Sequence, residues 1–199
     1  GVPHGIGIKP QFYMVKRLDT TGSWQVFTQP NINTSNATKY LVLNSTTAEA
    51  SATDRWNGYQ PDSTNFYLGT STEVNASGGT YVAYCFANVK GFSKTGSYVG
   101  NGNADGNFCF TGMKPSFVMI KCTSNATDWF INDNKRLGYN GGNKVLYPDL
   151  SNAEASSPQI DILSNGFKTR TVDSMINNSG YTYIYMAFAE NPLVGTNGV

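Results

Sequence analysis

Charged residues are scarce in this chain of 199 residues: Asp, Glu, Lys and Arg together make up 14%, and the formal net charge is +1. No cluster of Lys and Arg supplies the positive field that attracts nucleic acid or anionic lipid, so we expect neither as a partner. The longest apolar runs, such as residues 181–189, are about half as long as a bilayer-spanning helix. We therefore expect no membrane insertion.

Histidine and cysteine are also rare, which limits the available chemistry. The single histidine, His4, lies in a segment flanked by Pro and Gly, where a turn or strand-end residue is expected rather than the base of a catalytic triad. Cys85, Cys109 and Cys122 are odd in number and lack the spacing of a metal site, so at least one thiol is unpaired. The sequence predicts a protein that is not an enzyme and requires no cofactor.

Residues that suit strands and turns are abundant instead. Aromatic residues make up 13% of the chain, and 21 Gly and 8 Pro are available to separate short strands. No segment shows a sustained apolar period of 3.6 residues with helix caps. The composition predicts an all-β protein.

The chain contains an internal repeat. Residues 7–51 and 112–156 align without gaps at a shift of 105 and share 13 identities in 45 pairs, where random pairing would give about three. A shift of 102 aligns the Ser-Gly-x-Thr-Tyr sequence at 77–81 with that at 179–183. We expect a first β repeat at 1–90, a connecting strand and loop at 91–112, and a second β repeat at 113–199.

Each repeat opens with Lys-Pro-x-Phe-x-Met and closes with a nearly continuous apolar run, which is typical of strands buried on both faces. We expect an antiparallel β-sandwich, jelly-roll or lectin-like, in which the two repeats are fused around one core because half of the chain alone has a marginal core. Two separate beads are the alternative. The expected core residues are Phe12, Met14, Trp24, Phe86, Phe117, Met119, Trp129 and Phe188.

Glycoside hydrolysis requires only two carboxylates, so the residue inventory leaves it open. Glu49 and Glu154 are candidates at equivalent repeat positions. A duplicated acid more often repeats a structural contact, because an active site needs two different environments to separate its pKa values.

Loop aromatics are the candidates for sugar binding. Trp56, Tyr59, Tyr98, Tyr139 and Asn140 lie in segments rich in Asn, Gly and Asp, where flat rings and amide groups suit a carbohydrate. The alternative is that the rings cap the core or face a neighbouring subunit.

A second loop carries oxygen-bearing side chains at alternate positions. Asn101, Asn103 and Asp105 precede Gly106 in the manner of the first half of a calcium loop, so Ca²⁺ is the cation this segment would suit. The twelfth position of such a loop would be Gly112 instead of a bidentate Glu. A tight β-turn is the alternative.

The chain resembles repeat-containing domains of bacteriophage virion proteins, chiefly tail fibres and related appendages. The resemblance rests on Val-Pro-His-Gly-Ile-Gly-Ile-Lys-Pro at 2–10, Lys-Pro-Ser-Phe-Val-Met-Ile-Lys at 114–121 and Gly-Ser-Tyr-x-Gly-Asn-Gly at 96–102. It implies a β-sandwich module at the virion surface, in a homo-oligomer with a trimer favoured. It carries over no catalytic residues.

Three functions follow from the resemblance. The first is a non-enzymatic appendage module that adheres to a host cell-surface glycan. The second is a purely structural virion component, such as a decoration or fibre-shaft protein, whose partners are other virion proteins. The third is a polysaccharide depolymerase.

Overall fold

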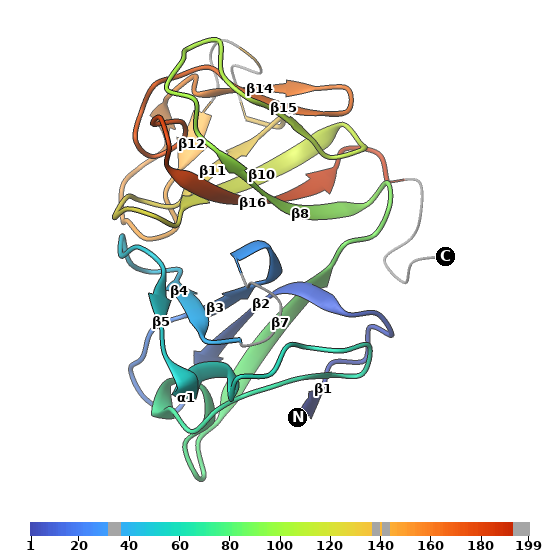
Figure 1. The fold of residues 1–199 in the computed structure, drawn as a ribbon, viewed down its shortest axis with the longest axis vertical. Coiled ribbons are helices and arrows are strands. Elements are labelled where there is room, and N and C mark those ends of the chain that lie inside the picture. Colours follow the sequence, from blue (N-terminus) through green and yellow to red (C-terminus); the bar gives the residue numbers. More distant parts are fainter. Residues whose placement is uncertain (32–36, 137–139, 141–143, 193–199) are drawn as a thin grey trace. The chain divides into compact units, whose positions relative to one another are not determined.

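The computed structural model describes residues 1–31, 37–136, 140 and 144–192 (Figure 1). The described residues form mainly β-strands in antiparallel sheets, which confirms the predicted all-β class. None of the helices among them is long and apolar enough to cross a membrane. The chain divides into two compact units, Gly1–Asn88 and Val89–Val199.

The first unit contains a five-stranded sheet with the order β5-β4-β3-β2-β7 and a two-stranded ribbon of β1 and β6. Its core cluster includes Tyr13 and Val15 from β2, Phe27 from β3, and Trp56 and Val74 from two short helices. The elements are β1 (Val2–Pro3), β2 (Pro10–Arg17), β3 (Gln25–Thr28), η1 (Gln29–Asn31), β4 (Lys39–Val42), β5 (Ala50–Ser51), α1 (Thr53–Trp56), β6 (Asn65–Phe66), α2 (Thr72–Asn75) and β7 (Tyr81–Ala87).

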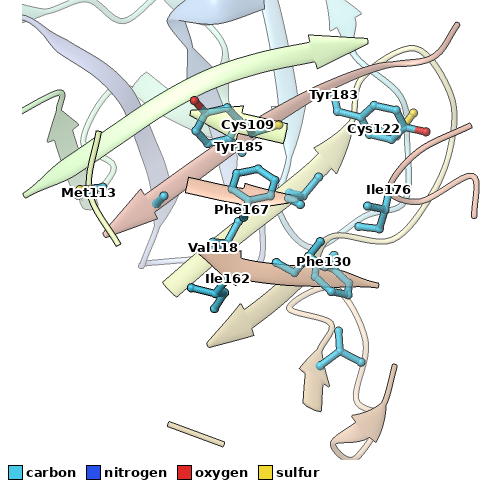
Figure 2. Packing of buried hydrophobic residues seen from close by; sticks show 14 residues of the cluster. Cys109, Met113, Val118, Cys122, Phe130, Ile162, Phe167, Ile176, Tyr183 and Tyr185 are labelled. Carbon is cyan, nitrogen blue, oxygen red and sulfur yellow. The ribbon is translucent and has the colours of Figure 1, made fainter. Parts of the chain in front are cut away.

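The second unit is a two-layer sandwich. A six-stranded sheet with the order β13-β12-β11-β10-β16-β8 packs on a three-stranded sheet with the order β14-β15-β9 through one apolar cluster. The ring of Phe167 lies amid this cluster, 5.1 Å from that of Tyr185 (Figure 2). The strands are β8 (Ser93–Val99), β9 (Phe108–Phe110), β10 (Pro115–Cys122), β11 (Phe130–Asp133), β12 (Lys144–Leu146), β13 (Ala155–Ser156), β14 (Ile160–Leu163), β15 (Gly166–Thr169) and β16 (Thr182–Ala189).

The two units share strand order and register where the sequence repeats. In each, the opening strand pairs with a following hairpin strand on one side and with the closing apolar strand on the other. Phe12 lies opposite Phe86 and Phe117 lies opposite Phe188, and both pairings follow an irregularity after the opening proline. Proline lacks the donor that a regular ladder needs there. This agreement is what a duplication would produce, and the duplication itself stays a prediction.

Of the eight expected core residues, three are buried and five are half-buried. Phe12, Met119 and Trp129 are buried, whereas Met14, Trp24, Phe86, Phe117 and Phe188 are partly exposed. The cluster within each unit uses the opposite face of the opening strand, through Tyr13 and Val15 or Val118 and Ile120. Sequence reasoning missed this face because both faces of these strands carry bulky residues. Fusion of the repeats into one sandwich stays a prediction.

The segment expected to connect the repeats, 91–112, lies within the second unit. It supplies β8, which pairs with β16 along seven residue pairs, and β9, which pairs with β15. Of its aromatic residues, Tyr98 stacks on Tyr183 and Phe92 contacts Phe188, whereas Phe108 and Phe110 are exposed.

Candidate functional site

Trp56 lies in the core of the first unit instead of on a surface loop. It is the last residue of α1 and is fully buried, its ring centroid 5.1 Å from that of Tyr13, and its Nε1–H donates to the backbone oxygen of Lys39 at 2.9 Å. The expected role of Trp56 in sugar binding is therefore corrected, because a ring enclosed in this way presents no face to a ligand.

Among the sugar-binding aromatics that fall in the described residues, Tyr59 is the most accessible, since it is 58% exposed. Its ring lies 5.4 Å from that of Tyr67 at an angle of 41°. The Tyr67 hydroxyl donates to Oδ2 of Asp62 at 2.7 Å, and this bond, followed by the backbone N–H groups of Asn65 and Thr64, lowers the pKa of Asp62 to about 2. The pair forms a small aromatic surface beside an ionised carboxylate.

Tyr98 serves packing. It lies in β8, stacks on Tyr183 at 5.0 Å and 14°, and donates its hydroxyl proton to the backbone oxygen of Ile176 at 2.7 Å. Burial raises the pKa of Tyr98 well above its usual range. The expectation of a loop residue available to sugar is corrected, because this tyrosine anchors a strand to the core.

The amide of Asn140, a further sugar candidate, is already bonded to the backbone. Asn140 donates from Nδ2 to the backbone oxygen of Ile162 at 2.9 Å and accepts from the N–H of Ile162 at 2.8 Å, so its amide already extends the edge of β14. Tyr139 lies outside the described residues.

In the segment expected to bind calcium, oxygens of the loop accept hydrogen bonds from a side-chain amide. Nδ2 of Asn177 lies 2.8 Å from Oδ1 of Asn101 and 2.8 Å from the backbone oxygen of Asn103. Oδ1 of Asn101 also accepts from the N–H of Asn103, and Oδ1 of Asn103 accepts from the N–H of Asp105. The Asp105 carboxylate pairs with Lys168 at 2.7 Å. These contacts fit a closed polar turn, the alternative named above, and calcium binding stays a prediction.

The duplicated glutamates each form an ion pair in their own unit. Glu49 pairs with Lys39, and Glu154 pairs with Arg136 at 2.7 Å. Across the described ranges, no three His, Cys, Asp or Glu side chains gather in a way that could hold a metal ion.

A cavity of about 470 Å³ opens in the first unit beside β7. The alternation of β7 turns Tyr81, Ala83 and Cys85 toward it, and Phe66 and Val74 line it from β6 and α2. Burial raises the pKa of Cys85 to about 11, so its thiol is protonated at neutral pH and is not a nucleophile there. Most of the lining residues are apolar, His4 and Asn75 are polar, and the thiol is neutral.

His4 helps to close one side of this cavity. Its Nδ1 lies 3.2 Å from the N–H of Ile6 and accepts from it, which assigns the proton to Nε2, and Nε2 lies 3.1 Å from the backbone oxygen of Asp62. His4 thus ties the N-terminal segment to the loop before β6, in agreement with a structural role.

The family described as a domain of unknown function (DUF7483) matches residues 1–192. The chain belongs to this family. No curated protein and no solved structure matches it. The DUF7483 match runs through both compact units, so the family domain includes the pair.

The cavity of this DUF7483 domain was missed by sequence reasoning. The repeat nevertheless contains a sequence feature that indicates the cavity. The shift of 102 that aligns Tyr81 with Tyr183 also aligns Ala83 with Tyr185. A small residue in place of a buried aromatic predicts missing volume.

The three cysteines of the DUF7483 domain are all free thiols. Cys109 and Cys122 are buried and Cys85 is half-buried. Burial raises the pKa of Cys109 to about 12. The described fold is held without a disulfide.

Proposed function

We propose that this chain is a non-enzymatic structural module of a bacteriophage virion, placed at the particle surface in a homo-oligomeric appendage. The observation that carries the structural role is the burial of the candidate recognition aromatics. Trp56 and Tyr98 are used in packing, and the Asn140 amide is bonded to the backbone. The resemblance to virion appendage domains supports the location.

The geometry supports architecture more than catalysis. The paired acids of the repeat, Glu49 and Glu154, each lie against a cation, which suits a repeated structural contact. The scarcity of charge and the abundance of short paired strands suit an exposed, protease-resistant shell or shaft.

Two measurements test this proposal. Light scattering should give a multiple of the chain mass of 21.6 kDa, with a trimer expected. Immunogold electron microscopy with antibodies against the chain should label the surface of phage particles that encode it. A monomer in solution, together with unlabelled particles, would contradict the proposal.

Host-glycan recognition is a second candidate, favoured by the exposed Tyr59 beside Tyr67. A glycan array and a whole-cell binding assay would test it, with Tyr59→Ala expected to abolish any signal. Tyr84→Ala is the matched control, because Tyr84 is also an exposed tyrosine, at 47%, but lies in β7 and away from this pair in the sequence. Binding that survives Tyr59→Ala would exclude this site.

A further inference from the structure

Two phenylalanine rings point outward from β9 in the second unit. Phe108 is 46% exposed and Phe110 is 63% exposed. Cys109, between them, belongs to the buried core cluster (Figure 2). Because successive side chains of a strand point to opposite faces, both rings lie on the outer face of the sheet β14-β15-β9. Single exposed apolar residues are ordinary, whereas two on one strand face form a patch.

The patch continues across the neighbouring strands. Gly166 lies opposite Phe110, and Leu163 lies opposite Gly166 and is half-buried. A Cβ at position 166 would lie 2.1 Å from the backbone oxygen of Cys109 and 3.1 Å from Cε2 of Phe108, so this ring lies against the bare backbone of β15. The two phenylalanines, Gly166 and Leu163 form one apolar surface, which we call the β9 face.

Ion pairs border the β9 face. Lys168 lies opposite Phe108, and Asp161 lies opposite Lys168. Lys168 binds Asp105 at 2.7 Å, and Arg170 binds Asp105 at 3.1 Å and Asp161 at 2.6 Å. The Asp105 side chain is 74% exposed. Two acids and two bases balance each other, so this border offers hydrogen-bond donors and acceptors without a net charge.

The area of the exposed rings indicates a small ligand. An aromatic side chain has roughly 150–250 Å² of surface, so the exposed parts of Phe108 and Phe110 together present on the order of 200 Å². A stable protein–protein interface buries about 800 Å² on each partner. The rings therefore supply about a quarter of the area that a second copy of the chain would need.

A sugar needs the combination of groups that this face presents. The C–H faces of a pyranose ring stack on flat aromatic rings, and its hydroxyls pair with donors and acceptors at the side. Phe108 and Phe110 are two positions apart in the strand, so their Cα atoms are about 7 Å apart, which is on the scale of a disaccharide. The balanced charge of the border favours a neutral sugar over a charged one.

We propose that the β9 face is a binding site for a neutral polysaccharide built from hexopyranose units. Phe108 and Phe110 stack on neighbouring sugar rings, and the carboxylate of Asp105 accepts hydrogen bonds from hydroxyl groups. The site goes beyond the proposed structural role. It is distinct from the candidate surface of Tyr59 and Tyr67, because those residues belong to the first unit.

The test uses the full chain on an array of neutral and uronic-acid-containing oligosaccharides, followed by calorimetric titration with the neutral glycan that gives the strongest signal. Phe108→Leu and Phe110→Leu should each weaken binding by about tenfold, because leucine is apolar but has no flat ring. Phe110→Tyr should restore it. Leu18→Ser is the matched control, since Leu18 is an apolar residue of the first unit that is 58% exposed, and it should bind as the unaltered chain does.

Several outcomes would overturn the proposal. Absence of binding to every neutral hexose glycan would do so, as would equal binding by both leucine variants. Loss of binding in Tyr59→Ala, with Phe110→Leu unaffected, would assign the sugar to the Tyr59 surface instead. A dimer in sedimentation velocity that Phe110→Leu disrupts, without glycan binding, would assign the β9 face to a second copy. Immunogold labelling of particles does not affect these outcomes, so this proposal and the virion role fail separately.

Discussion

Asn177 and Asn101 exchange two hydrogen bonds across 76 positions of sequence. Nδ2 of Asn177 donates to Oδ1 of Asn101 at 2.8 Å, and the N–H of Asn101 donates to Oδ1 of Asn177 at 3.0 Å. The same amide reaches the backbone oxygens of Asn103 and Thr171. A single buried side chain thus closes the loop between β8 and β9.

Asn177→Ala should lower the free energy of unfolding of the second unit by about 2–4 kcal/mol, because it removes a fully buried side chain that makes several hydrogen bonds. Urea unfolding followed by circular dichroism would measure it. The repeat supplies a control in Asn75, which is exposed and donates one such bond, to the backbone oxygen of Gly69. Asn75→Ala should cost less than about 1 kcal/mol. Equal losses for the two variants would contradict this account.

Calcium should leave this loop unchanged. The oxygens of Asn101 and Asn103 already accept N–H groups, and Asp105 is paired with Lys168 and Arg170. We therefore expect the same thermal midpoint with millimolar CaCl₂ and with EDTA. A higher thermal midpoint in calcium that is lost in Asp105→Asn would instead support the calcium-binding loop that the sequence suggests.

Lys121 should give the second unit a distinctive pH dependence. Burial, opposed by Asp149, Cys122 and Asp128, lowers the pKa of Lys121 to about 8 from its ordinary 10.5. Between those values the unfolded chain holds more protons than the folded one, so this residue makes stability rise with pH. Below about pH 8 both states are protonated and the dependence ends.

The comparison of Lys121→Met with the unaltered chain isolates this effect. We expect the stability of Lys121→Met relative to the unaltered chain to fall by about 2–3 kcal/mol between pH 7 and pH 10, because Met does not titrate. Effects of tyrosines and thiols cancel in the difference. Lys16→Met is the control at the equivalent, half-buried repeat position, and a slope of the same size there would refute the assignment to Lys121.

The side chain of Tyr185 leaves no room for a Cβ atom at position 96. A Cβ at position 96 would lie 2.5 Å from the hydroxyl oxygen of Tyr185 and 2.6 Å from its Cζ, so Gly96→Ala should cost about 1–3 kcal/mol. In a Tyr185→Ala background the same change should cost less than about 0.5 kcal/mol, because the clashing ring is gone. Chemical denaturation of the four proteins of this cycle would measure the coupling. Additive losses would show that the two residues are independent.

Much of the fold was accessible from the sequence because it depends on local pattern. The opening strands were placed by Lys-Pro followed by alternating apolar residues, and they begin at Pro10 and Pro115 as expected. Which strand face forms the core of each unit was not accessible, because Tyr13 and Met14 are both bulky and only distant partners decide between them.

The candidate site was less accessible for a related reason. Segments rich in Asn and Gly occur both at exposed loops and at turns that deliver an aromatic ring into a core. Trp56 follows a short helical turn into the first unit, whereas Tyr59, three residues later, remains exposed. Asn177 was also beyond local reasoning, since its partners at 101 and 103 lie more than seventy residues away.

The free thiols carry a consequence for where this fold is stable. Disulfide exchange requires a thiolate, and burial keeps Cys85 and Cys109 protonated at neutral pH. No segment of the described chain relies on a sulfur cross-link to stay in place. The same architecture is therefore available both to a newly made chain among cellular reductants and to a mature one exposed to air.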